Sequence, residues 1–186
     1  MKTKPIFSGD TIELTDAPNT MPSEFVQKLI NNYRSNQLTA INTKFGMEDA
    51  HSIRFDLATL KKFISDIENE AQKVDSGITE NDLGIRFYYA AYPQANNWDM
   101  MENTPIGTNY AGKHTLVMIP TLKMENADGE ILSYDFHPLD ASTYNQNSDN
   151  DGEQGEVMAM NKALTAVLSQ NHGNLIPPDD KKVEEY

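Results

Sequence analysis

The stretch from Gly84 to Pro93 holds the residue types best suited to recognition or chemistry. Side chains alternate between the two faces of a strand, so Arg86, Tyr88 and Tyr92 are expected to share one face. Arginine offers a rigid fork for a carboxylate or phosphate, and phenols donate hydrogen bonds or stack. The pattern predicts a surface that binds a small anionic ligand or a protein partner. The alternative is that Arg86 pairs with an acid of this chain while the tyrosines cover a helix.

Two further residues are expected to extend this surface. Arg54 belongs to a short strand candidate earlier in the chain, and Trp98 stands in a long loop beside Met100 and Met101. A tryptophan next to methionines is typical of an interface anchor or a pocket lid. The alternative is that the loop, residues 94–113, folds back as a plug over the core.

Histidines indicate a second chemistry. His114 opens one predicted strand and His137 follows its predicted hairpin partner, which places both near the same end of a sheet. Together with Asp135 or Asp140 they would form a metal or acid–base site. No H-x-x-x-H or H-E-x-x-H spacing is present, so no local zinc signature supports this reading. The alternative is that these histidines cap strand ends.

An acidic loop resembles the beginning of a calcium site. Asn147, Asp149 and Asp151 alternate as oxygen donors and Gly152 follows, as in the first half of an EF-hand loop. The twelfth position is Met158, where an EF-hand needs a bidentate glutamate. The sequence therefore excludes a complete EF-hand and leaves a looser calcium site or a solvated loop.

Composition narrows the function classes further. The net charge of −13 disfavours direct binding to nucleic acid, which needs clustered lysine and arginine. The chain has no cysteine, which excludes disulfides, thiolate nucleophiles and iron–sulfur clusters. No apolar run approaches the roughly 20 residues of a membrane span, and the N-terminus has no secretory pattern. We expect a cytoplasmic protein that does not enter the membrane.

Hydrophobic periodicity locates the elements that position these side chains. The expected elements are helices at 25–33, 57–74 and 157–169, and strands at 51–55, 84–92, 114–124 and 131–136. A polar linker is expected between the first helix and His51. The strand that begins at His114 is apolar on both alternating sets, so it is expected to be central in its sheet. An Asp-Gly pair after it predicts a hairpin.

These elements predict an α+β fold with an antiparallel or mixed sheet of about three to five strands and helices packed mainly on one face. Residues 1–20 are expected to be an irregular arm, 21–178 one domain, and 179–186 a flexible acidic tail.

Three landmarks resemble a group of small uncharacterised Bacteroidota proteins. They are Gly84-Ile-Arg-x-Tyr with Tyr92-Pro93, Thr115-Leu-Val-x-Ile-Pro-Thr121, and Asn171-His-Gly-x-Leu-x-Pro-Pro178. In that group a cysteine often follows the two prolines, whereas this chain has Asp179. The resemblance covers the region from the first helix to Pro178 and implies a family shape without an activity.

The sequence favours a non-enzymatic recognition domain that binds a protein or a small anionic ligand, with no cofactor required. An enzyme built around His114 and His137 is an alternative from a different class. A third is an acidic mimic of nucleic acid that binds a basic partner, since acidic residues number 28 against 15 lysines and arginines.

Overall fold

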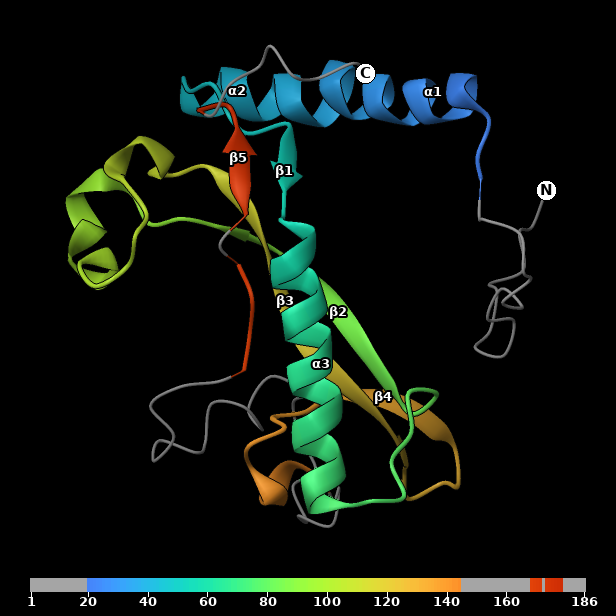
Figure 1. The fold of residues 1–186 in the computed structure, drawn as a ribbon. Coiled ribbons are helices and arrows are strands. Elements are labelled where there is room, and N and C mark those ends of the chain that lie inside the picture. The colour runs from blue at the N-terminus through green and yellow to red at the C-terminus, as the bar shows by residue number, and fades with distance from the viewer. Residues whose placement is uncertain (1–19, 145–167, 172, 179–186) are drawn as a thin grey trace.

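The computed structural model describes residues 20–144, 168–171 and 173–178, which form an α+β fold with antiparallel sheets (Figure 1). The helices are α1 Ser23–Tyr33, α2 Thr39–Phe45 and α3 Leu57–Val74, and the shorter helical turns are η1 Arg34–Leu38, η2 Ala95–Met101, η3 Thr108–Tyr110 and η4 Ala141–Tyr144. The strands are β1 Ser52–Arg54, β2 Leu83–Ala91, β3 His114–Glu125, β4 Ile131–Asp135 and β5 Asn174–Ile176. The predicted fold class is confirmed.

The larger sheet is an antiparallel meander in the order β2–β3–β4. Its central strand is β3, as the apolar residues on both of its faces predicted. The turn between β3 and β4 places Gly129 at a φ of 78°, a left-handed conformation that glycine adopts without strain. The predicted hairpin is therefore confirmed.

Helix α3 covers one face of this sheet and has the predicted bounds (Figure 1). Its buried stripe, Phe63, Ile67 and Ala71, repeats at helical spacing and packs with Met118 of β3. Phe136, which follows β4, completes this layer and is fully buried. We call this set the sheet core. It fixes α3, β2 and β3 as one unit.

A second, two-stranded sheet pairs β1 with β5 in antiparallel register, with Ser52 opposite Ile176. The sequence predicted β1, but no strand was predicted after Gly173, where only the end of a helix was expected. Three residues are too few for a period of two to be recognised. The N–H of His51 also donates to the carbonyl of Ile176 (2.8 Å), which extends this pairing.

The predicted polar linker after the first helix is wrong, because the helix continues. Helix α1 runs through the π turn η1 into α2, and the three form one long rod at the end of the molecule (Figure 1). No glycine or proline interrupts residues 34–45, and Leu38 and Ile41 prolong the apolar stripe. Gly46, at a φ of 62°, ends the rod in the left-handed conformation.

The calcium candidates Asn147, Asp149 and Asp151 lie outside the described residues, as do nearly all of the predicted third helix, most of the N-terminal arm and the acidic tail.

Candidate functional site

Arg86 and Tyr88 lie on one face of β2, as predicted, and both contact Asp135. The guanidinium forms an ion pair with this carboxylate and donates to the carbonyl oxygen of Ser133 (2.8 Å). The Tyr88 hydroxyl donates to the other carboxylate oxygen of Asp135. The Arg86 guanidinium is thus paired within this chain, with Asp135 and the carbonyl of Ser133. This corresponds to the alternative prediction that Arg86 pairs with an acid of this chain.

Tyr92 does not belong to this face. It follows the end of β2, and only 5% of it is exposed. Its ring packs against Trp98 and Tyr110, with centroid distances of 6.4 and 5.7 Å, and its hydroxyl donates to the carbonyl of Asn171 (3.3 Å). Burial raises the pKa of the Tyr92 hydroxyl. The expectation that Arg86, Tyr88 and Tyr92 emerge together is wrong, because Tyr92 is buried in a second cluster with Tyr110 and Trp98.

Trp98 and Arg54 also lie apart from Arg86. Trp98 packs on a second buried cluster, which includes Tyr92, Tyr110 and Leu175, so its loop covers that cluster as a plug. Arg54 stands in the two-stranded sheet and pairs with the exposed carboxylate of Asp56 (2.7 Å). The five predicted binding residues therefore fall into three separate places.

The two predicted histidines do not meet. Phe136 donates its N–H to Pro120, so His137 lies level with Ile119 rather than with His114. Five residues separate those levels, which is roughly 16 Å along a strand. His137 is buried, and its N–H donates to the hydroxyl of Thr143 (3.0 Å). The predicted convergence is wrong because β4 pairs only with the second half of β3. Within the described part of the chain no group of acidic and histidine side chains is arranged to hold a metal ion.

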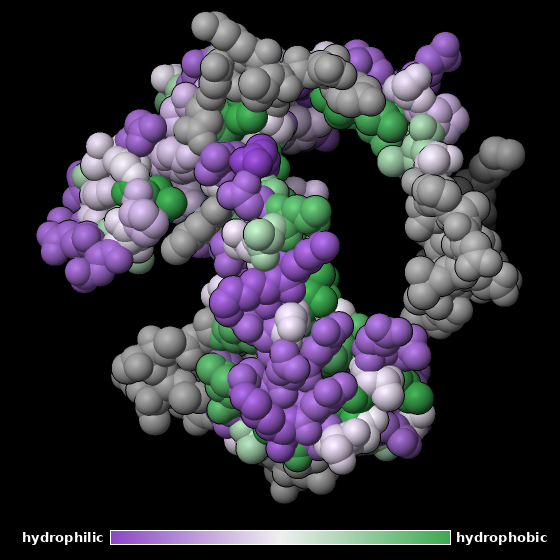
Figure 2. Space-filling view, in the orientation of Figure 1, coloured by the Kyte–Doolittle hydropathy of each residue, from purple (hydrophilic) through white to green (hydrophobic). Residues whose placement is uncertain are grey.

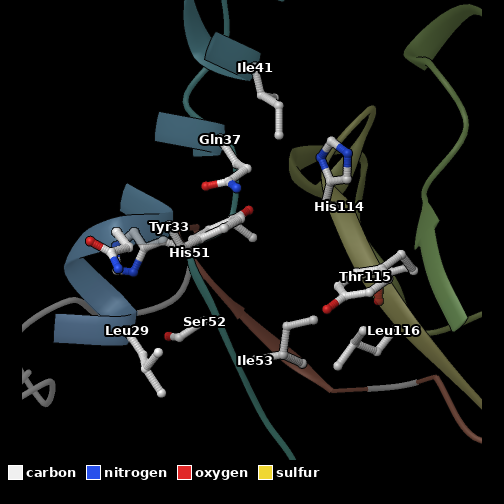
Figure 3. A pocket seen from close by; sticks show the side chains of 13 residues that line it. Leu29, Tyr33, Gln37, Ile41, His51, Ser52, Ile53, His114, Thr115 and Leu116 are labelled. Atoms are coloured by element: carbon white, nitrogen blue, oxygen red, sulfur yellow. The ribbon is translucent and has the colours of Figure 1, made fainter. Parts of the chain in front are cut away.

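His114 instead borders a cavity of about 690 Å³ between the long helical rod and the first residues of β1 and β3 (Figure 3). Three elements far apart in the sequence form its walls, so only the folded chain creates it. The lining residues are Leu29, Asn32, Tyr33, Gln37 and Ile41 from the rod, Ala50, His51, Ser52 and Ile53 around β1, and Tyr89, His114, Thr115 and Leu116 from the larger sheet. We call this space the rod cavity.

A buried carboxylate anchors the wall of the rod cavity. Asp49 is 1% exposed, and one of its oxygens accepts the N–H groups of Ala50 and His114, each at 2.8 Å. Its second oxygen contacts Nδ1 of the His114 ring, and this contact is an ion pair when the imidazole is protonated. Asn42 accepts the N–H of Asp49 (2.9 Å), which ties this loop to α2. Asp49 thereby holds His114 in one orientation at the edge of the cavity.

Hydrogen-bonding side chains as well as apolar ones line the rod cavity. Figure 3 shows Tyr33 and Gln37 from the rod on the side opposite His114. Burial raises the pKa of the Tyr33 hydroxyl, and the charges of Asp49 and Tyr89 raise it further, so this hydroxyl stays protonated and can donate. His51 lies at the same wall and contacts Arg34 through Nδ1 (3.4 Å). The arrangement suits a ligand with an apolar body and a few polar groups.

Sequence reasoning selected His114 but missed its partner. Asp49 precedes the short strand β1 without any pattern that marks it as buried. Tyr33 ends the apolar stripe of α1, which predicted only packing. The proximity of these residues depends on the pairing of elements distant in the chain, and no local spacing encodes it.

Comparisons of the chain with protein-family models, with curated proteins and with solved structures find no match. Among the described helices, none combines the length and apolar character needed to cross a bilayer.

Proposed function

We propose that this chain is a non-enzymatic recognition domain whose ligand site is the rod cavity. The ligand class is a small, mainly apolar molecule with a hydroxyl, carbonyl or amide group. The observation that carries the proposal is a cavity walled by three elements, in which a buried aspartate orients His114 opposite the Tyr33 hydroxyl.

The size and lining of the cavity support a small-molecule ligand. Ligand pockets commonly occupy about 300–1,000 Å³ and combine apolar walls with a few fixed polar groups. The rod cavity, at about 690 Å³, falls within that range and has both kinds of wall. Leu29 and Leu116 supply apolar contact, while Tyr33, His51 and His114 supply hydrogen bonds.

Charge favours an uncharged ligand over the anion first expected. Arg86 and Arg54, the cations of the expected surface, pair with Asp135 and Asp56. At the rod cavity, Asp49 places a carboxylate directly behind His114. The chain as a whole carries a net charge of −13, which lowers the local concentration of anions.

The test uses benzamide and indole as probes, titrated into ¹⁵N-labelled protein while amide shifts are followed. We expect saturable shifts at Tyr33, His51, His114 and Leu116. Leu116→Trp should fill the cavity and weaken binding at least tenfold. Leu132→Trp is the matched control, because it makes the same change on β4 outside the lining and should leave the affinity unchanged.

Two results would contradict the proposal. One is the absence of saturable shifts with either probe. The other is equal weakening by both tryptophan variants, which would indicate a general effect on the fold rather than a filled cavity.

One observation favours a second candidate function, general acid–base catalysis. A histidine whose Nδ1 contacts a buried carboxylate has its other ring nitrogen directed to a defined place, as in enzymes that use histidine as a base. Ser52 lines the same cavity and offers a hydroxyl.

Proton abstraction from 5-nitrobenzisoxazole tests this candidate, since the substrate needs only a base in an apolar site. A rate above buffer catalysis that disappears in His114→Phe would support it. A rate equal to buffer, or one unchanged by His114→Phe, would remove it and leave ligand binding intact.

A further inference from the structure

We propose that the outer edge of β2 pairs with β2 of a second copy of this chain, joining two three-stranded sheets into one. The inference concerns the edge of β2, whose Tyr89 also lines the rod cavity, and it does not depend on a ligand. It rests on the open edge, on its lack of charge, and on the register that a two-fold axis imposes.

The backbone groups on this edge can be assigned from the pairing with β3. Tyr92 donates its N–H to Lys113, and Asp82 accepts the N–H of Lys123, so even-numbered residues point their backbone groups toward β3. Those of Ile85, Phe87 and Tyr89 therefore point away from it. No described residue pairs with this outer edge, because β2 is the terminal strand of its sheet.

The edge lacks the features with which proteins usually block such pairing. Protective devices include proline, bulges, and charged side chains, lysine above all. The ladder between β2 and β3 runs through nine consecutive pairs without a bulge. The only charged residue in β2 is Arg86, whose side chain reaches across the sheet to Asp135 on β4. The open side thus presents no free charge to a neighbouring strand.

A second copy is the occupant that this edge fits best. Antiparallel pairing of a strand with itself obeys a two-fold axis, the commonest symmetry of protein dimers. Full overlap of Leu83–Ala91 centres the axis on Phe87, which then exchanges backbone hydrogen bonds with Phe87 of the second copy. Ile85 falls opposite Tyr89, an aliphatic–aromatic pair that stabilises sheets. Tyr89 is 92% exposed in the single chain, so the pairing gives it a partner.

Helix α1 supports the same arrangement. Figure 1 shows it extending beyond β2 at one end of the sheet, and Figure 2 shows hydrophobic surface along it. Phe25 and Leu29 on this helix are 50% and 49% exposed, and Phe87 on the strand is 52% exposed. A second sheet placed at this edge would bring apolar surface toward both.

The experiment measures mass by sedimentation equilibrium over a concentration series. We expect the native chain to approach twice its 20.9 kDa mass. Phe87→Pro removes an outward N–H and leaves the ladder to β3 intact, so it should raise the dimer dissociation constant at least tenfold. Ser133→Pro is the matched control, since Ser133 lies on the opposite edge of the sheet and also points its N–H outward.

The salt dependence of the dimer dissociation constant distinguishes pairing between uncharged strands from a contact made by ion pairs. Two copies with a net charge of −13 each repel, so sodium chloride should tighten the dimer by screening this repulsion. A dimer that weakens with salt would overturn the proposal, as would a native chain that stays monomeric up to its solubility limit. Equal dimerisation of Phe87→Pro and Ser133→Pro would also overturn it.

Hydrogen exchange of the native chain keeps the proposal testable if Phe87→Pro does not fold. The amides of Phe87 and Tyr89 should gain protection as the concentration rises, while exposed amides on β4 such as Ser133 do not. Protection that is independent of concentration would count against the pairing.

Discussion

Helices α1 and α3 both have an apolar stripe, but only α3 buries it. In α3, Phe63, Ile67 and Ala71 are buried against the sheet core, whereas no residue of α1 is buried. Phe25 and Leu29 of α1 are each about half exposed. The two helices have the same kind of sequence pattern and different surroundings.

This contrast separates residues that stabilise the fold from residues available for binding. A buried stripe contributes to the free energy of unfolding through the water it excludes. A stripe left open contributes little to stability and remains available to a ligand or another chain. Leu29 of the open stripe on α1 lines the rod cavity.

The largest expected effect tests this contrast by replacing phenylalanine with alanine at one buried and one exposed position. Phe136→Ala removes a fully buried ring that packs edge-on against Tyr144 (5.3 Å between centroids). It should lower the free energy of unfolding by about 3–5 kcal/mol. Phe25→Ala on α1 should lower it by less than about 1 kcal/mol. Urea denaturation followed by circular dichroism measures both, and equal losses would show that Phe25 of α1 is packed as tightly as the sheet core.

An intermediate effect is expected at Asp49. Asp49→Ala leaves the N–H groups of Ala50 and His114 without their acceptor and should cost about 2–4 kcal/mol. Asp56→Ala is the control, because Asp56 forms an exposed pair with Arg54 and should cost less than about 1 kcal/mol. Amide shifts should change around the rod cavity in Asp49→Ala and stay unchanged in the sheet core. Changes spread evenly over both regions would contradict this assignment.

The smallest expected effect is a loss of stability at alkaline pH. Burial, and then the charge of Glu70, raise the pKa of Tyr144 from 10.0 to about 12. The native state therefore holds this proton more tightly than the unfolded state, so the stabilisation is complete below pH 10 and is lost as the pH rises through about 12. Tyr144→Phe should flatten the alkaline fall in the urea midpoint. A fall of unchanged size in that variant would assign it to other tyrosines, such as Tyr33.

The sequence was informative where a pattern is local and long. The period of the apolar residues in α3, the alternation in β2 and β3 and the Asp-Gly turn each depend on neighbouring residues, and all were predicted correctly. The failures concern contacts between distant segments. Tyr92 was expected beside Arg86 because alternation was continued past the last residue of β2. His137 was expected beside His114 because both strands were assumed to pair over their full lengths.

The candidate site was the least predictable part for the same reason. His114 was selected as a titratable group, but its partner Asp49 is brought to it by the loop after α2. Neither the rod cavity nor the open edge of β2 follows from one segment alone, since each depends on which elements pack together and which do not.

The pairing of β1 with β5 affects the order in which parts of the fold form during synthesis. Ser52 meets Ile176 only after the whole segment between them has been synthesised, and contacts between such distant residues form late because closing a long loop costs entropy. Residues 50–53, which include the first two residues of β1, also form one wall of the rod cavity. The nascent chain can therefore assemble α3 with its sheet before that wall of the rod cavity is held in place by β5.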